Sequence, residues 1–201
     1  MDAKKLKVES IPSWMSDVMQ GICYWIGHRK SYYRQHPLSE GALTAELCNL
    51  IASGIDGTLS CETPYKSLVK NLKSRERLDI LIDESVTGGQ VIAIEVKRGS
   101  ASKIDINKDI IRLAALKKAN QQYRTFLMLI SEDKLPQQLP WIAEDQAGHT
   151  TIKANTKTII LHDESAEPYI CLKVRRVCKA MGSTKPKQVH SAILVEVFNC
   201  K

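Results

Sequence analysis

The sequence predicts an α/β fold with a mixed central sheet flanked by helices, in a single domain of 201 residues. Two observations support this class: strand-length apolar runs alternate with amphipathic segments of helical spacing, and a Gly-Gly turn separates two of the strand-like runs. No linker-like tract divides the chain. We expect an N-terminal helical extension (residues 1–38), a core (residues 39–130) and a C-terminal extension of that core (residues 131–201).

Two helices and a strand are predicted ahead of residue 77. Apolar residues recur at helical spacing between Trp14 and Ile26, and residues 39–51 show the same periodicity. Residues 58–66 have strand character, and Pro64 within them indicates an edge position or a strand end.

An antiparallel hairpin is predicted for residues 77–82 and 91–97, because glycine tolerates the positive φ angles of tight hairpin turns. If the hairpin is centred near Thr87, Asp79 and Glu95 lie opposite each other, since each is eight residues from that centre. Facing residues are roughly 4.5–5.5 Å apart at Cβ, so two carboxylates there would repel each other.

A divalent cation would turn this repulsion into ligation. The strand at residues 91–97 begins with apolar residues on both faces, which is typical of a central strand where buried charge is costly unless paired or metal-bound. Asp79 and Glu95 supply the hard oxygen ligands that Mg²⁺ prefers. Lys97 shares a face with Glu95 and would point toward the metal, the attacking water or the charge of the transition state.

The core is completed by a helix and a strand after the hairpin. Residues 105–118 are amphipathic, with Asp105 or Asn107 as the expected N-cap. Residues 123–130 are apolar and predict a buried strand.

Asp79 followed by Glu95-Val96-Lys97 at the end of an apolar strand resembles the PD-(D/E)XK nuclease superfamily, the fold of many restriction and repair nucleases. The resemblance covers residues 46–130 and implies a restriction-endonuclease-like αβββαβ core. It also implies that Asp79, Glu95 and Val96 bind Mg²⁺, for which Mn²⁺ can substitute, and that Lys97 positions or activates water. The residue before the aspartate is leucine here, where the superfamily pattern has proline. The alternative is an edge hairpin with a solvated salt bridge.

Glu46 is a further candidate, because it lies three residues after Leu43 and four before Leu50, on the apolar stripe of its helix. Superfamily members often carry a glutamate on the helix before the sheet, which implies that Glu46 reaches the metal directly or through water. Glu40 falls among the cap residues of the same helix, where an acidic side chain favours the helix dipole.

The C-terminal extension is expected to add to the sheet or to form a small cap. Pro136 and Pro140 indicate a loop or short helix around Trp141, and Gly148-His149 indicates a turn. Further strands are predicted at residues 157–162, 169–177 and 191–198. A helix at residues 173–181 is the alternative for part of this region.

The charge of the chain favours a polyanionic partner. Lys and Arg number 29 against 22 Asp and Glu, for a formal net charge of +7. Basic residues flank the proposed site and would neutralise phosphates of nucleic acid, with DNA favoured over RNA. These candidates are Lys73, Arg75, Arg77, Arg98, Lys103, Lys108 and Arg112. For each one, an ordinary solvated surface is the alternative.

A second candidate surface for nucleic acid is the segment at residues 28–36, which mixes basic and aromatic side chains that can hold phosphates and stack unpaired bases. Packing and helix termination are the alternative.

The six cysteines include no Cys-x-x-Cys pair, and several fall in apolar stretches, as reduced buried thiols do. Apolar runs are too short to span a bilayer and no signal core follows the N-terminus, so we expect a cytoplasmic protein without a membrane partner.

Together these features predict a Mg²⁺-dependent DNA endonuclease, in which water attacks phosphorus in line with the leaving oxygen. Restriction, phage defence, mobile-element processing and repair are the processes that the resemblance implies. One site cleaves one bond, so a homodimer or a partner subunit would serve to cut both strands. Two alternatives stay open: a nuclease-fold subunit that binds nucleic acid without cutting it, and an interaction subunit that docks an acidic protein or a larger assembly.

Overall fold

The structure, a computed structural model, describes residues 10–33, 38–69, 76–84, 90–132, 142–144, 150–152, 157–160, 170–181 and 189–199. The helices of this part of the chain are α1 (Ser13–Tyr32), α2 (Glu40–Ala52), α3 (Tyr65–Leu68) and α4 (Lys103–Ala119). The strands of the main sheet are β1 (Thr58–Pro64), β2 (Arg77–Asp83), β3 (Val91–Arg98), β4 (Tyr123–Ser131), β7 (Lys157–Ile160), β8 (Ile170–Met181) and β9 (Val189–Asn199). A separate two-stranded sheet consists of β5 (Ile142–Glu144) and β6 (Thr150–Ile152).

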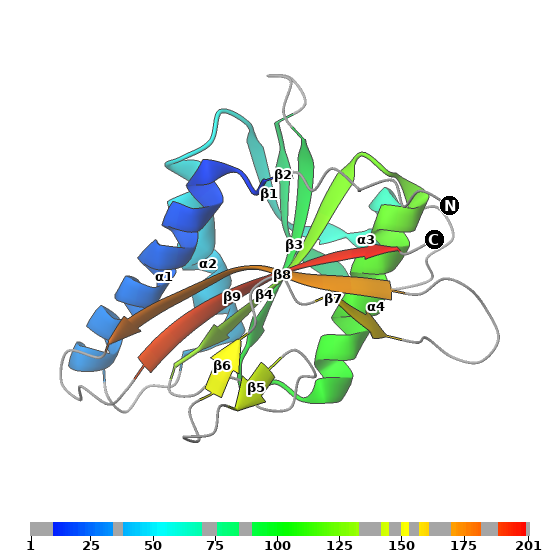
Figure 1. Ribbon diagram of the computed structural model, residues 1–201. Coiled ribbons are helices and arrows are strands. Elements are labelled where there is room, and N and C mark those ends of the chain that lie inside the picture. Colours follow the sequence, from blue (N-terminus) through cyan, green and yellow to red (C-terminus); the bar gives the residue numbers. More distant parts are fainter. Residues whose placement is uncertain are drawn as a thin grey trace.

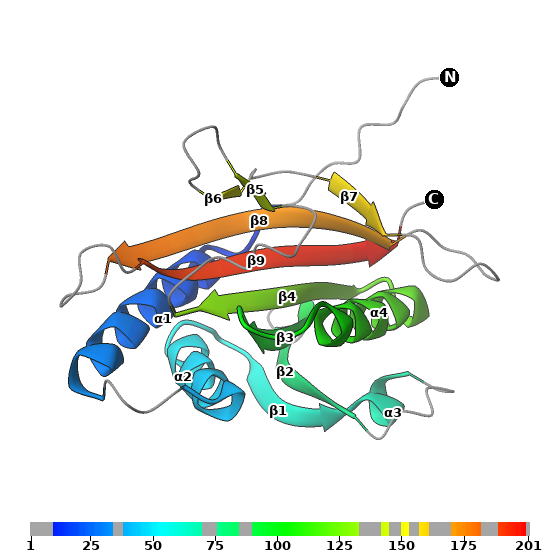
Figure 2. The same cartoon turned by 90° about the horizontal axis from the view of Figure 1, so that it is seen from below.

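The main sheet has seven strands in the order β1-β2-β3-β4-β9-β8-β7 (Figure 1). Strands β3 and β4 are parallel and the other neighbours are antiparallel. Helices α1 and α2 pack on one face of the sheet and α4 packs on the other (Figure 2). The predicted α/β fold with a mixed central sheet flanked by helices is therefore confirmed.

Elements α2, β1, β2, β3, α4 and β4 follow one another in the predicted order, with the short α3 inserted after β1. Strand β1 lies at the edge of the sheet and ends at Pro64, which has no N–H to donate to a neighbouring strand. The prediction of a strand through residue 66 is wrong, because Tyr65 and Lys66 belong to α3.

Helix α2 forms where the sequence combines a cap with an apolar stripe. The Ser39 hydroxyl accepts a hydrogen bond from the Ala42 N–H at 3.1 Å, which satisfies one of the unpaired donors of the first turn. Leu43, Leu47 and Ile51 recur every four residues and are fully buried against the sheet. Burial of this stripe fixes the rotation of α2 about its own axis, and with it the direction in which the side chains of its first turn point.

The β2–β3 hairpin has the predicted pairing. Ile80 lies opposite Ile94 and Leu81 opposite Ala93, and continuing this register by one residue places Asp79 opposite Glu95. The turn itself lies outside the described residues. The pairing brings two carboxylates, one from each strand of the hairpin, into adjacent positions.

The β3–α4–β4 crossover requires a glycine where it leaves β3. The Gly99 N–H donates to the Ile130 carbonyl at 2.7 Å, and a Cβ on Gly99 would lie 2.8 Å from Ser131 Cβ. The ends of β3 and β4 therefore approach each other more closely than a residue with a Cβ atom at position 99 would allow.

The N-cap of α4 is Ser102, so the prediction of Asp105 or Asn107 is wrong. The helix begins two residues earlier than predicted, which places Asp105 in its first turn. The Ser102 hydroxyl accepts a hydrogen bond from the Asp105 N–H at 3.1 Å and donates one to the Asp105 carboxylate at 2.7 Å. Each residue therefore supplies a hydrogen-bond partner for the other.

Strand β8 runs to Met181, and the alternative of a helix at residues 173–181 is wrong. A β-bulge between Val174 and Arg176 explains the misleading pattern. Before the bulge, alternate residues such as Leu172 pack on the α4 side, and after it Cys178 and Ala180 pack on the α1 side. The bulge reverses the faces and so breaks the period of two that identifies a strand.

Strand β5 occupies residues 142–144, where a loop or short helix was predicted. Pro136, Pro140, Trp141 and Gly148-His149 lie outside the described residues. The predicted strands at residues 157–162, 169–177 and 191–198 correspond to β7, β8 and β9, which extend the main sheet as expected. In the described part of the chain, no helix is long and apolar enough to cross a membrane.

The cysteines only partly follow the expectation of reduced thiols. Cys23, Cys48, Cys61 and Cys178 are free, and Cys23 and Cys178 are buried. Burial raises the pKa of the Cys23 thiol to about 12, which keeps it protonated. Cys171, in contrast, is disulfide-bonded, so the expectation is wrong for this residue.

Candidate functional site

The candidate active site lies at the carboxyl end of β3, where α2 and α4 both begin. Asp79 on β2 is half-buried, and its Oδ2 accepts a hydrogen bond from the Val96 N–H at 2.7 Å. The Val96 side chain points into the core beneath α1 and α2, so its described contact with the site is through the N–H group. This bond fixes the Asp79 carboxylate beside β3.

Glu95 is almost fully buried, with 1% of its surface exposed. The Tyr65 hydroxyl, on α3, donates to Glu95 Oε1 at 2.6 Å. Burial and the nearby Asp79 carboxylate raise the pKa of Glu95 to about 9, against the Tyr65 hydrogen bond, which lowers it. Two carboxyl groups thus lie close enough that, without a cation, one of them holds a proton at neutral pH.

Lys97 lies between two helices. Its Nζ is 3.3 Å from Glu40 Oε2 on α2 and 3.2 Å from Asp109 Oδ2 on α4. The other Glu40 oxygen accepts from the Arg98 N–H at 3.5 Å. The amine is therefore held at the end of β3 by carboxylates from both helical layers.

Asp109 and Arg112 extend the cluster along α4. Asp109 is 1% exposed, and its Oδ2 has no hydrogen-bond partner among the described residues despite the nearby Lys97 amine. Arg112 contacts Asp109 and Glu76, and its guanidinium carbon is 5.7 Å from the centre of the Tyr65 ring. Buried carboxylates of this kind persist only when they are paired.

Carboxylates outnumber cations in this cluster: Glu40, Glu76, Asp79, Glu95 and Asp109 surround Lys97 and Arg112. This excess and the hard oxygen donors fit an added divalent cation. No group of three or more histidine, cysteine, aspartate or glutamate side chains in the described ranges is arranged to hold a metal ion. Asp79 and Glu95 form a pair, and Mg²⁺ often binds through one or two carboxylates plus water and phosphate oxygens.

Glu46 is half-buried on α2, and among the described residues no hydrogen bond or ion pair joins it to Asp79, Glu95 or Lys97. Glu40 lies in the first turn of α2, as the sequence predicts, and it also contacts Lys97, which the sequence does not predict. Sequence reasoning also missed Asp109 and Tyr65. The signal for Asp109 was available, because it falls on the apolar stripe of its helix just as Glu46 does.

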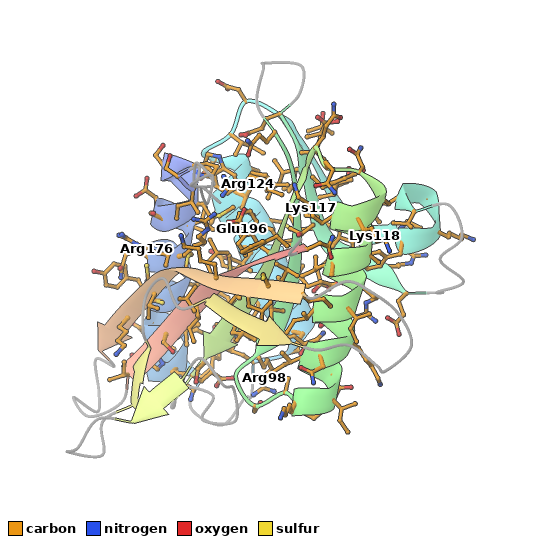
Figure 3. All side chains as sticks on the ribbon, turned by 45° about the vertical axis from the view of Figure 1, so that its right-hand side comes forward. Arg98, Lys117, Lys118, Arg124, Arg176 and Glu196 are labelled. Carbon is orange, nitrogen blue, oxygen red and sulfur yellow. The ribbon has the colours of Figure 1, made fainter. Side chains whose placement is uncertain are left out.

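The proposed phosphate-binding residues differ in how much they are already paired. Arg98, which lies beside the start of α4 in Figure 3, pairs with Glu132 at 3.0 Å. Lys108 lies 3.5 Å from Asp105 on the helix surface. Lys103 and Arg77 are exposed, Arg112 points inward to carboxylates, and Lys73 and Arg75 lie outside the described residues.

No family model matches this chain, and no curated protein or solved structure is similar enough to it to count as a match. The functional assignment therefore depends on the geometry of the site.

Proposed function

We propose that the protein is a metal-dependent phosphodiester hydrolase, a DNA endonuclease with a restriction-endonuclease-like core. The observation that carries the proposal is the convergence of Asp79 and Glu95 on neighbouring strands, with Lys97 two residues beyond Glu95 at the end of the central strand. The element order α2, β1, β2, β3, α4 and β4 supports it, because it is the order of the αβββαβ core.

Asp79 and Glu95 would hold Mg²⁺, which when bound supplies Lewis-acid polarisation of the phosphate and a more acidic water. The Tyr65 hydroxyl fixes the Glu95 carboxylate through its 2.6 Å hydrogen bond. The Lys97 amine would orient the nucleophilic water and stabilise charge on the phosphate. Glu40 and Asp109 position this amine from two sides.

One observation favours a second function, that of a nuclease-fold subunit that binds nucleic acid without cutting it. Lys97 is already engaged by two carboxylates, and the described residues form no cluster of three metal-ligating side chains. A retained scaffold with an inactive site would have these features. The two functions differ in whether Mg²⁺ binding depends on Asp79.

The test of hydrolysis is incubation of the purified protein with plasmid DNA, linear duplex, single strands and RNA in Mg²⁺ or Mn²⁺. We expect cleavage that falls about 100-fold or more in Lys97→Ala, which removes the amine that stabilises transition-state charge, and in Asp79→Asn, which removes a ligand of the metal. Lys118→Ala is the matched control, since Lys118 is an exposed lysine on the last turn of α4 (Figure 3). Its activity should equal that of the wild type.

Metal titration by calorimetry separates the two functions. Mg²⁺ or Mn²⁺ binding that is lost in Asp79→Asn supports the hydrolase. Absence of both cleavage and Asp79-dependent metal binding would reject it in favour of the inactive subunit.

A further inference from the structure

The last turns of α1 carry an exposed aromatic and basic surface that the proposed active site does not use. We call it the α1 aromatic face, and it consists of Tyr24, Trp25, His28, Arg29, Tyr32 and Tyr33. Helical spacing arranges these residues in two adjacent rows, one of Tyr24, His28 and Tyr32 and one of Trp25, Arg29 and Tyr33. Tyr24 is 64% exposed, Tyr32 73% and Tyr33 57%, so these rings do not serve the core.

The side chains within each row contact one another. The Arg29 guanidinium carbon is 5.3 Å from the centre of the Trp25 ring and 5.5 Å from that of the Tyr33 ring. The His28 and Tyr32 ring centres are 4.9 Å apart. These contacts hold the flat faces in place before any ligand arrives, which reduces the entropy lost on binding.

Arg29 supplies a positive charge to this face. Its guanidinium carbon lies close to the rings of both Trp25 and Tyr33. A fixed guanidinium attracts anions such as phosphate through its charge. Rings beside a cation therefore match the base and the phosphate of a nucleotide.

Two ion pairs connect this end of α1 to the candidate active site. Glu132 pairs with Lys30 at 3.1 Å through one oxygen and with Arg98 at 3.0 Å through the other. Arg98 directly follows Lys97, and its N–H contacts Glu40. The C-terminal end of α1 therefore lies at the same end of the sheet as the site, and α1 packs against α2, on which Glu40 lies.

We propose that the α1 aromatic face binds unpaired bases of a nucleic-acid strand that continues into the candidate active site, an inference that rests on the proposed hydrolase function. Bases within a duplex are covered by their neighbours, so stacking on protein rings requires unpaired bases. Tyrosine, tryptophan and arginine also form the centres of protein interfaces. The net charge of +7 and the adjacent phosphodiesterase site favour nucleic acid as the occupant.

The proposal predicts a substrate class, namely branched, flapped or gapped nucleic acid with a single-stranded segment beside the scissile bond. Aromatic stacking is tolerant of sequence, so base composition should matter little.

The test measures binding without cleavage. Wild-type protein in EDTA is titrated against fluorescein-labelled single-stranded and duplex 20-mers of several sequences, with anisotropy as the readout. Tyr32→Leu/Tyr33→Leu should weaken single-strand binding about tenfold or more and duplex binding less than about threefold. Tyr32→Phe/Tyr33→Phe is the matched control, because it keeps the rings and should retain wild-type affinity.

Each outcome bears on the proposal separately from cleavage. Unchanged single-strand affinity in the Leu variant overturns it and indicates a protein as the occupant of this face. An equal loss in the Phe variant also overturns it, because the hydroxyls and not the rings would then carry the binding. Ring-dependent binding by a protein that never cuts supports the stacking face while rejecting the hydrolase. Unfolding midpoints confirm that all variants are folded, as expected for exposed positions.

Discussion

Glu95 illustrates how a single residue is controlled by opposing contacts. Burial and the Asp79 carboxylate disfavour its ionised form, whereas the hydrogen bond from Tyr65 favours it. The net effect raises the pKa to about 9. The same arrangement that would favour a bound cation is therefore a cost to the cation-free protein.

This cost predicts how stability depends on pH. Between about pH 4.5 and 9 the unfolded chain has released the Glu95 proton and the folded protein has retained it, so stability falls as pH rises. The slope from this group is at most about 1.4 kcal/mol per pH unit. The glutamine of Glu95→Gln cannot ionise. The unfolding free energy of this variant, relative to that of the wild type, should therefore increase as pH rises. Urea unfolding in metal-free buffer between pH 5 and 9 measures this, and a constant difference would contradict it.

The candidate site could be predicted from sequence only where its residues are close in the chain. The equal spacing of Asp79 and Glu95 about one turn was enough to place them opposite each other. The contact between Glu40 and Lys97 depends instead on how α2 packs on the sheet. A capping position gives no sign of such a contact, because its local role already explains an acidic residue.

At the scale of elements, the close approach of β3 and β4 determines where the parallel pair ends. The chain leaves β3 at Gly99, packed against Ser131 at the end of β4, before α4 begins. This geometry sets the position of Lys97 and Arg98, which directly precede the glycine. Packing between the ends of β3 and β4 therefore helps to fix the positions of the site residues that precede Gly99.

Gly99→Ala should therefore lower stability, by about 1–3 kcal/mol, because its Cβ would lie 2.8 Å from Ser131 Cβ and the strand ends would have to separate. Gly41→Ala, on α2, is the matched control, because a Cβ there meets nothing within 4 Å. It should be neutral or slightly stabilising, since alanine favours helices. Denaturant unfolding of both variants checks the prediction, and equal effects would refute it.

Most elements could be predicted from hydrophobic period alone, and the errors have local physical causes. Residues 173–181 were ambiguous because a β-bulge reverses the faces of β8 near Val174. The start of α4 was placed late because Ser102, and not Asp105 or Asn107, provides the cap. Periodicity reports which face is buried, and it carries little information about bulges and caps.

At the scale of the whole molecule, one sheet contains strands from both the core and the C-terminal extension. A buried ion triad spans this junction, with Glu196 on β9 between Arg124 on β4 and Arg175 on β8. The Arg124 Nε is 3.0 Å from Glu196, and these two residues lie side by side in Figure 3. Arg124 and Glu196 are 6% and 9% exposed, so their charges depend on each other.

Glu196→Gln should destabilise the protein by about 3–5 kcal/mol, because it leaves two largely buried guanidinium groups without a counter-charge. The matched control is Glu62→Gln on the edge strand β1, where an exposed side chain should change stability by less than about 0.5 kcal/mol. Chemical denaturation measures both. A loss in Glu196→Gln no larger than that of the control would show that the triad does not stabilise the junction.

The double engagement of Lys97 implies mechanical coupling across the molecule. The Lys97 ammonium group pairs with Glu40 on α2 and with Asp109 on α4, so it links the helices on the two faces of the sheet. An anion that binds at this amine competes with both carboxylates for its positive charge. Anion binding at Lys97 would therefore weaken the link between α2 and α4, so tighter binding would leave the two helices freer to move relative to each other.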